Sequence, residues 1–447
     1  MIYFADLHVH SKYSRATSKD CDLYGLSHWA ALKGIKVVAT GDFTHPEWRK
    51  EIHENLEPRE DGLFGLKSDS KPDILLESLD FSASDVRFIL NVEISSIYKK
   101  KGKVRKAHNL IFMPDMQTMD NFCEQLDKRG NLNSDGRPII GIDCKDLLSI
   151  ALETSDRSFL IPAHIWTPWF SVLGSKSGFD SIEECFEDLT DYILAIETGL
   201  SSDPEMNFTV SELDKFTLVS NSDMHSPSRL GREVNIFSGE PSYQAIREAL
   251  RLGGSGCRNT DNFLGPRQSI VNDKLLQNGS SRFVGTIEFF PEEGKYHMDG
   301  HRKCGVRLIP QKTEALGGKC PVCGHPVTVG VMNRVNQLAD RPVGHTPPKA
   351  GYYWRMLPLI EITAECLGCG VQAKKARDLH SSLIKDLGPE LELLWSLPLD
   401  TVSAIAPPIV VEALRRVRAE QVRIDAGYDG EYGRISIFEE KERKSFS

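Results

Sequence analysis

Histidine and acidic residues recur along the first half of the chain, and these are the side chains that bind divalent metal ions. His8 and His10 stand two residues apart, and Asp223 and His225 repeat that spacing. Four further candidates lie between these pairs: His45, Glu93, His108 and His164. Imidazole suits Zn²⁺, whereas carboxylates also accept harder ions such as Mg²⁺ and Mn²⁺. Several such ions close together can activate water and hold the oxygens of a phosphate, so the set indicates phosphoester hydrolysis.

These candidates fall at or near the ends of segments whose sequence predicts β-strands. The strands are expected at 2–7, 35–40, 87–93, 104–112, 159–162, 193–197 and 217–220, and helices at 22–33, 119–129, 145–153, 181–189 and 242–252. This alternation favours a parallel sheet with crossover helices, and we expect a barrel, whose active site lies at the carboxyl ends of the strands. A lone histidine at one such position is more often a packing residue. The coincidence of all of them at strand ends is what favours a metal site.

Four of the ten cysteines form two CxxC pairs, which in an intracellular protein indicate metal binding before disulfides. They are Cys320, Cys323, Cys366 and Cys369. Each pair is followed by a glycine, which suits the tight turn of a zinc knuckle. We therefore predict one structural zinc site with four cysteine ligands, and unrelated thiols are the alternative. His297, His301 and Cys304 form a further candidate set, which Gly300 disfavours because it interrupts the helix that this histidine spacing needs.

Basic and aromatic residues near the metal candidates are candidate nucleic-acid contacts. Six cations form one short run between Glu93 and His108: Lys99, Lys100, Lys101, Lys103, Arg105 and Lys106. If Glu93 and His108 lie on neighbouring strands, this run is a hairpin at the rim of the site, where it would bind phosphates. Three tryptophans follow the histidines closely: Trp48, Trp166 and Trp169. They can stack on bases, at ~1–3 kcal/mol each. A solvated turn and the cores of loops are the alternatives.

The composition is that of a globular protein and excludes a disordered chain or a fibre, with 447 residues, 40% hydrophobic and 26% charged. No apolar run is long enough to span a bilayer, and the first residues do not form a secretory signal. We therefore expect a cytoplasmic protein without a membrane partner. The net charge of −9 argues at first against nucleic acid. Residues 301–423, however, carry 17 Lys/Arg against 11 Asp/Glu, so the total decides little.

Shifts in composition divide the chain into five parts, with a boundary where Gly, Pro and Asn become frequent after residue 253. We expect a metal-dependent barrel at 1–255, a linking region at 256–310, a four-cysteine zinc-binding domain at 311–380, a helical region at 381–425 and a polar tail at 426–447. No segment indicates a protein partner.

The segment DLHVHSKYS at 6–14 resembles the opening motif of the PHP (polymerase and histidinol phosphatase) superfamily. Five further motifs follow in that superfamily's order: GDFTH at 41–45, NVEIS at 91–95, AHNLIF at 107–112, PAH at 162–164 and SDMH at 222–225. The resemblance implies a distorted (β/α)7 barrel, a TIM-like α/β fold, with a multinuclear metal site that hydrolyses phosphoesters. The superfamily usually has an aspartate where Arg15 stands, and the motif leaves open whether Arg15, Asp20 or Asp42 takes part.

Four segments are similar to endonuclease Q, a family of DNA-repair enzymes: SRATSKD at 14–20, GDFTHPEW at 41–48, GKYHMDGHRKCGV at 294–306 and AGYDGEYGRISIF at 426–438. This resemblance covers nearly the full length. It implies metal-dependent hydrolysis of the DNA phosphodiester 5′ to deaminated bases (uracil, hypoxanthine, xanthine) and at abasic sites, so the expected partner is damaged DNA.

The endonuclease Q resemblance also implies roles for residues of this chain. The catalytic set is expected to be Asp223, Glu93, His225, His8 and His10, with zinc, Mg²⁺ or Mn²⁺ at the barrel site. A damaged base would be flipped into a pocket among the loops after His45, His164 and Glu197. A PHP-type nucleotide phosphatase or exonuclease acting on short nucleic acids, and a non-catalytic DNA-binding adaptor, are the alternatives.

Overall fold

The computed structural model describes residues 1–67, 85–254 and 281–446. Its first crossover shows how local sequence sets the architecture. Strands β1 (Ile2–Asp6) and β2 (Ile35–Ala39) are buried, largely apolar runs that pair in parallel. Helix α1 (Leu23–Lys33) connects them. The side chain of Asp22 caps its first turn, and Gly34 ends it in the left-handed conformation that glycine adopts without strain.

Further strands extend this sheet on both sides. Beyond β2 lie β5 (Arg87–Lys100), β6 (Lys103–Met113) and β8 (Phe159–Pro162), and beyond β1 lie β11 (Val234–Ser238), β12 (Arg282–Glu288) and β15 (Tyr352–Arg355). Strands β9 (Ala195–Glu197) and β10 (Thr217–Val219) pair in parallel as a second sheet. The α/β class is confirmed. Antiparallel pairing of β6 with β5 and β8, and of β11 with β1, departs from an all-parallel sheet, and the distorted barrel of seven units stays a prediction.

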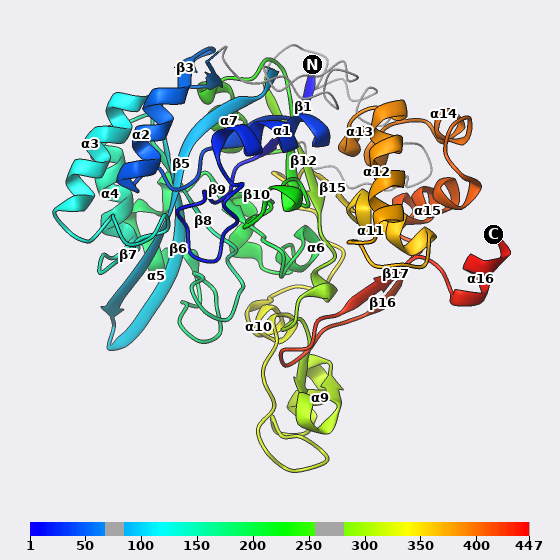
Figure 1. Cartoon of the computed structure of the whole chain (residues 1–447). Coiled ribbons are helices and arrows are strands. Elements are labelled where there is room, and N and C mark those ends of the chain that lie inside the picture. The colour runs from blue at the N-terminus through cyan, green and yellow to red at the C-terminus, as the bar shows by residue number, and fades with distance from the viewer. Residues whose placement is uncertain (68–84, 255–280, 447) are drawn as a thin grey trace.

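Helices cover the sheet and short elements complete its connections (Figure 1). The covering helices are α2 (Pro46–Asn55), α3 (Met116–Asp127), α4 (Cys144–Thr154) and α7 (Tyr243–Leu252). The short elements are β3 (Leu56–Pro58), β4 (Phe64–Leu66), β7 (Ile139–Ile140), α5 (Ile182–Phe186) and α6 (Pro204–Asn207). Every strand and helix that the sequence predicts before residue 255 is present, and most ends are shifted by a few residues at most. The exception is β5, which was predicted to end at Glu93 and continues to Lys100, so Glu93 lies within the strand.

Buried asparagines connect the segments that follow the strands. The side chain of Asn91 donates to the carbonyl of Leu7 at 2.9 Å and accepts from the amide of Gly41 at 2.7 Å. Asn221 accepts from the amide of Leu7 at 2.7 Å. These bonds satisfy backbone groups that leave the sheet, and they hold the segments after β1, β2 and β10 side by side.

A lobe projects from the sheet at the bottom of Figure 1, with α9 at its far end. It contains β13 (Asp299–His301), β14 (Val306–Leu308), α9 (Pro310–Ala315) and α10 (Val331–Leu338). One small apolar cluster lies in it, with Leu308, Cys320 and Val327 as its buried members. So small a core needs another source of stability, such as a bound metal.

A group of helices packs beside the barrel on the right of Figure 1. They are α11 (Leu359–Cys366), α12 (Lys374–Leu387), α13 (Glu390–Trp395), α14 (Leu399–Ser403) and α15 (Pro408–Arg418). The chain ends with β16 (Arg423–Asp425), β17 (Arg434–Ser436) and α16 (Glu440–Ser445). None of the helices in the described ranges has the length and apolar character needed to cross a membrane.

Three predicted boundaries differ from the structure. The helical part begins at Leu359, within the predicted zinc-binding segment. The predicted linking region contains β12, a strand of the main sheet, although its residues 256–280 lie outside the described ranges. The predicted polar tail contains β17 and buries Ile435, Ile437 and Phe438. The segment 434–438 has only three apolar residues, Ile435, Ile437 and Phe438, and so short a pattern does not predict a strand.

A buried ion pair joins the barrel to the helical group. Lys33, at the end of α1, lies 2.7 Å from Glu390 of α13, and both side chains are 2–3% exposed. His380 also contacts Glu390, at 3.1 Å. Burial alone would raise the pKa of Glu390, but the charge of Lys33 and the bond from His380 lower it to about 2.

Replacing Lys33 with Met is therefore expected to lower the free energy of unfolding by about 3 kcal/mol, because it leaves a buried carboxylate uncompensated. Urea unfolding measures this. In the wild type, the stability from Glu390 is present above its ordinary pKa of 4.5 and is lost as the pH falls toward 2. Lys444→Met, at an exposed ion pair, is the matched control and leaves the urea midpoint unchanged. Equal midpoints for the two variants would contradict this role of the pair.

Candidate metal centre

A first group of metal-binding side chains joins the segments after β1 and β10. It consists of His8, His10 and Asp223, whose ligand atoms lie within 4.8 Å of one another. The Nε2 atoms of His8 and His10 lie 3.6 and 3.1 Å from Oδ1 of Asp223. Both histidines are buried, whereas the Asp223 side chain is 25% exposed. The group therefore opens to solvent on the side of Asp223.

A second group forms across the β5–β6 hairpin and the end of β8. Glu93 and His108 lie on the two antiparallel strands, and His164 follows β8. Oε1 of Glu93 lies 2.7 Å from Nδ1 of His108 and 3.2 Å from Nε2 of His164. All three side chains are buried and their ligand atoms meet the same 4.8 Å limit.

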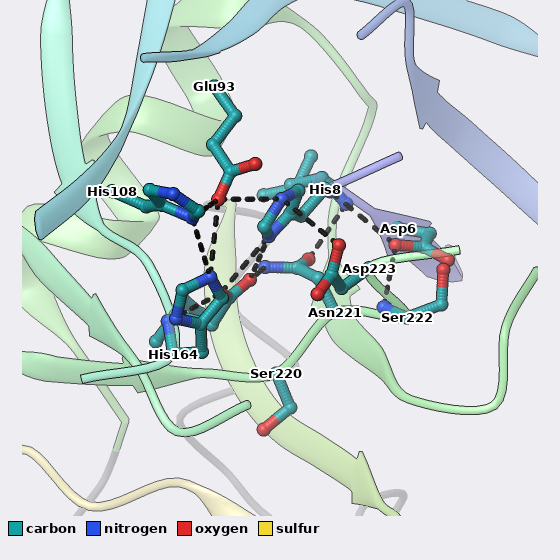
Figure 2. Close-up of polar contacts among 12 residues, drawn as sticks. Asp6, His8, Glu93, His108, His164, Ser220, Asn221, Ser222 and Asp223 are labelled. Atoms are coloured by element: carbon teal, nitrogen blue, oxygen red, sulfur yellow. Dashed lines mark hydrogen bonds and ion pairs between the residues drawn. The ribbon is translucent and has the colours of Figure 1, made fainter. Parts of the chain in front are cut away.

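Glu93 connects the two groups (Figure 2). Its Oε1 lies 3.6 Å from Nε2 of His8, and its Oε2 lies 3.3 Å from Nε2 of His10. One carboxylate thus contacts both sets of ligands, which is the arrangement in which a carboxylate can bridge two ions. The two groups form one continuous site of six candidate ligands.

Outer carboxylates orient the first two histidines. The Nδ1 atoms of His8 and His10 donate to Glu197 at 3.0 Å and to Asp42 at 3.1 Å. This fixes the tautomers and turns both Nε2 atoms into the site. Nε2 of His8 is buried without a hydrogen-bond partner among the described residues. A buried imidazole nitrogen in that position is explained by a metal ion, so the residues fit a divalent ion.

The backbone is strained at three residues of this site. Asp42, His164 and Asp223 have φ values of 49°, 30° and 43°, in the left-handed region that disfavours side chains other than glycine. Such strain persists where the surrounding structure holds it, and it concentrates at functional sites. Next to His164, Gly199 has a φ of 63°, and a Cβ there would lie 2.5 Å from the Cβ of His164.

The charges within the site keep its carboxylates ionised. Burial alone would raise the pKa of Glu93, but His108, Arg137 and His8 hold it well below its usual range. The pKa of Asp223 is also lowered, because the effect of His8 and His10 outweighs that of burial. Burial lowers the pKa of His108 to about 4, so its ring is neutral near pH 7 and able to bind a metal ion.

Two predicted ligands lie outside these groups. His45 precedes α2, and its ring stacks on Tyr13 with centroids 4.4 Å apart. His225 lies beside His10, with ring centroids 4.5 Å apart, at the solvent side of the first group. Of the residues whose part was open, Asp42 orients His10, while Asp20 is exposed and accepts a bond from Ser18.

Sequence reasoning missed Arg137 and assigned no role at the metal to Glu197. Glu197 ends β9, so its position at a strand end was a usable signal. Arg137 belongs to the loop before β7, where no periodic pattern marks it. Its Nη1 lies 3.0 Å from Oε2 of Glu93, and its side chain is 27% exposed. It therefore adds a positive charge at the mouth of the site.

The three tryptophans have different environments. The indole of Trp48 is buried and donates to the carbonyl of Gly41 at 2.8 Å, and that of Trp166 is buried and donates to Asn207 at 2.7 Å. Both are packing residues, so the expectation that they contact bases was wrong. Trp169 is 45% exposed and packs edge-on against Tyr296, with centroids 6.1 Å apart.

The six cations of the β5–β6 hairpin also divide. Lys100 pairs with Asp143 and Glu187 at 3.1 and 3.0 Å. Arg105 is buried over the ring of Phe179, and Lys106 lies over Phe170. Solvent-exposed side chains remain at Lys99, Lys101 and Lys103. The hairpin tip is roughly 25 Å from Glu93 along the extended strand, so the exposed cations lie away from the rim of the site.

An open cavity of about 760 Å³ lies next to segments that carry metal ligands, although none of the six candidate ligands lines it. The loops after His164 and Glu197 line it, whereas the loop after His45 does not. The base pocket predicted among these three loops stays a prediction. Two lining residues contact the ligand segments. Oγ1 of Thr167 lies 3.3 Å from Nδ1 of His164, and Arg232 donates to the carbonyl of Ser222 at 2.8 Å.

The predicted four-cysteine site has a different membership. The side chains that meet are His301, Cys304, Cys320 and Cys323, within 4.8 Å of one another. Cys366 ends α11 in the helical group, where its thiol is buried and donates to a backbone carbonyl, and Cys369 follows it. Figure 1 shows α11 well separated from α9 and the lobe. The prediction that both CxxC pairs share one site is therefore wrong, and the disfavoured His301 and Cys304 belong to the cluster.

The donor set of this cluster fits zinc. Three sulfurs and one imidazole match the ligands of structural tetrahedral zinc sites. Burial would raise the pKa of Cys320, but the amides of Cys323 and Val322 lower it to about 7, which favours the thiolate form that binds metal. His301 and Cys304 lie at the turn of the β13–β14 hairpin, which brings them together without the helix that their spacing was thought to need.

Cys304→Ser is expected to remove about one equivalent of zinc from the purified protein, because three remaining donors bind zinc far more weakly. Elemental analysis measures the loss. Cys369→Ser is the matched control and retains the full zinc content. Equal loss from both variants would support the four-cysteine arrangement instead.

Gly199→Ala is expected to displace His164 and weaken binding of Mn²⁺ or Zn²⁺ by at least tenfold in calorimetric titration, as lost support of a ligand does. Gly102→Ala separates clash from backbone strain, because Gly102 has a φ of 76° but no heavy atom within 4 Å of the added Cβ. Equal metal affinities for the two variants would show that the contact with His164 is unimportant.

The chain is similar to known proteins over nearly its full length. A family model described as the MJ0043 C-terminal domain matches residues 358–421. The uncharacterized protein MJ0043 of Methanocaldococcus jannaschii is 32% identical over 309 residues, 68% of this chain and 36% of that protein, so the chain spans about a third of that relative.

Two solved structures match almost end to end. The crystal structure of the lesion-specific endonuclease PfuEndoQ from Pyrococcus furiosus has a TM-score of 0.80 and 29% identity, covering 98% of this chain and 96% of that one. A complex of endonuclease Q with a 27-mer duplex, with an abasic lesion at its active site, has a TM-score of 0.78 and 29% identity, covering 98% of both chains. The chain belongs to the endonuclease Q family.

Proposed function

We propose that this protein is a DNA-repair endonuclease that hydrolyses the phosphodiester 5′ to deaminated bases (uracil, hypoxanthine or xanthine) and abasic sites. The observation that carries the proposal is the cavity of about 760 Å³, whose lining residues Thr167 and Arg232 contact His164 and the segment before Asp223. A nucleotide turned out of a duplex needs such a pocket next to the reacting phosphate. The complex of a family member with abasic DNA supports the same class of substrate.

Divalent ions would be held by the two ligand groups, His8, His10 and Asp223, and Glu93, His108 and His164. When bound, such ions activate water and neutralise charge on the phosphate. Zinc is proposed for the His301–Cys323 cluster, and zinc, Mn²⁺ or Mg²⁺ for the barrel site. Glu197 and Asp42 keep the first two imidazoles in place, and the strained backbone at Asp223 directs its carboxylate into the site.

Other residues of the chain would bind and orient the DNA. Arg137 offers a guanidinium beside Glu93, suited to a phosphate oxygen. Trp169 and Tyr296 present aromatic rings at the cavity for stacking. Exposed Lys99, Lys101 and Lys103, roughly 25 Å away, would contact phosphates about seven base pairs along the duplex.

The test is a 5′-labelled duplex with one deoxyuridine, deoxyinosine or abasic site, incubated with Zn²⁺, Mg²⁺ or Mn²⁺ in turn. We expect one cut 5′ to the lesion. Asp223→Asn is expected to slow cutting at least 100-fold, since loss of a residue that only orients a metal ligand already costs about 10–100-fold. It keeps DNA binding, because it removes a negative charge that repels phosphate.

Asp400→Asn makes the same change at an exposed position and leaves the rate unchanged. Shortening of the DNA from its ends, whatever the internal base, would identify a phosphatase or exonuclease. Binding without cutting under every metal condition would identify an adaptor.

A further inference from the structure

Glu293 places a carboxyl group in the cavity wall. It ends the short 3-10 helix at Pro291–Glu293, and its backbone is fixed by bonds to Phe290 and Gly433 at 3.0 and 3.1 Å. Its side chain lines the cavity together with Trp169 and Tyr296. Oε1 is buried and has no hydrogen-bond partner among the described residues. An unsatisfied polar atom beside a cavity calls for a ligand or a functional explanation.

Within the described ranges, the cations that face Glu293 are engaged by other groups and form no ion pair with it. Arg229 is bonded to Glu361 of α11 at 3.0 Å, and Arg232 is bonded to the carbonyls of Ser222 and Asp223 at 2.8 and 3.4 Å. From the residues next to it, Glu292 adds a like charge, and the ammonium of Lys295 lies over the rings of Tyr296 and Tyr432.

Desolvation therefore favours the uncharged acid. Burial, and then the like charge of Glu361, raise the pKa of Glu293 to about 8, while Arg229 opposes this. At pH 7 the side chain is a carboxylic acid, which can donate a hydrogen bond as well as accept one.

Deamination changes one group on a base from donor to acceptor. Cytosine and adenine present amino donors at C4 and C6, whereas the deaminated bases present a carbonyl oxygen there, as thymine does at O4. An ionised carboxylate can only accept, so it suits the amino group of an undamaged base. A neutral acid can donate to the new carbonyl, and a site built around such a bond rejects bases that cannot make it.

We propose that Glu293 is a specificity-determining residue, whose carboxyl donates a hydrogen bond to the carbonyl oxygen that deamination creates on the flipped base. This inference rests on the proposed function. It assigns to Glu293 the rejection of cytosine and adenine, and it leaves the hydrolysis itself to the metal-ligand groups.

The experiment compares single-turnover cutting of two duplexes that differ only at the lesion, deoxyuridine or an abasic site. The abasic duplex has no base to recognise, so the ratio of the two rates isolates recognition from chemistry and from metal binding. Glu293→Ala is expected to lower the uracil-to-abasic ratio about tenfold at pH 7, the size of one lost hydrogen bond. Glu431→Gln, at an exposed position of the C-terminal hairpin loop, is the control and keeps the ratio.

The dependence on pH gives a second readout that a merely structural role would not move. In the wild type the ratio is expected to fall about tenfold by pH 9, because one unit above its pKa about a tenth of the acid stays neutral. Glu293→Gln cannot ionise and keeps an N–H donor of similar shape, so its ratio is expected to stay high. It also measures any effect of ionisation of the base itself.

Cutting of abasic DNA with an unchanged ratio in Glu293→Ala would overturn the inference and leave the proposed function standing. The same holds if wild type and Glu293→Gln share one pH profile. If abasic DNA is not cut under any metal condition, the proposed function fails and the inference fails with it. Should Glu293→Ala not fold, the Glu293→Gln profile decides alone.

Discussion

The contact on which the site depends is the buried carboxylate of Glu93 among four imidazoles. It reaches His8 and His10 on one side and His108 and His164 on the other, at 2.7–3.6 Å. A buried charge of this kind is costly unless it is paired on all sides. This pairing requires side chains from distant parts of the chain to meet at one place. Glu93 and His108 meet there because β5 and β6 pair without a break.

An outer layer of polar groups makes this convergence rigid. Glu197 and Asp42 hold two imidazoles, and buried amides hold the segments after the strands. The left-handed backbone at Asp42, His164 and Asp223 costs on the order of 1–3 kcal/mol each. Such strain persists only because packing leaves no alternative, as at Gly199, where even a methyl group would overlap His164. Part of the stability of the fold is thus spent on the geometry of the site.

The sequence predicted what depends on strand direction. His8, His10, His164 and Asp223 could be grouped in advance because the ends of neighbouring strands meet at one edge. Glu93 and His108 lie within β5 and β6, and the pairing of these two strands brings them to the same site. The sequence did not predict what depends on side-chain surroundings. All three tryptophans follow strands in the sequence, yet only two of them are buried. Trp48 is held by the carbonyl of Gly41 in the turn after β2, and Trp166 by the side chain of Asn207. In the same way, the acidic partners of Lys100 lie in segments remote from it in sequence.

The cysteines show the same limit on a larger scale. Two CxxC pairs are equivalent as patterns, and the spacing alone could not tell that Cys366 belongs to a helix in another part of the fold. A glycine that disfavours a helix does not disfavour a hairpin, and Gly300 lies within β13 between Asp299 and His301. The histidine spacing disfavours a metal site only if the segment is a helix. In the β-hairpin that forms instead, His301 and Cys304 lie beside Cys320 and Cys323.

The net charge of −9 acquires a different meaning once burial is known. Asp42, Glu93, Glu197, Glu233 and Glu288 are all buried, so these acidic residues are not available to repel DNA at the surface. Glu93 and Asp42 already pair with histidines, and bound cations would neutralise more of this charge. Outside, Arg137 at the mouth and the lysines at the hairpin tip present positive charge. Because a phosphate backbone responds to the local field rather than to the total, an acidic chain of this construction can bind DNA.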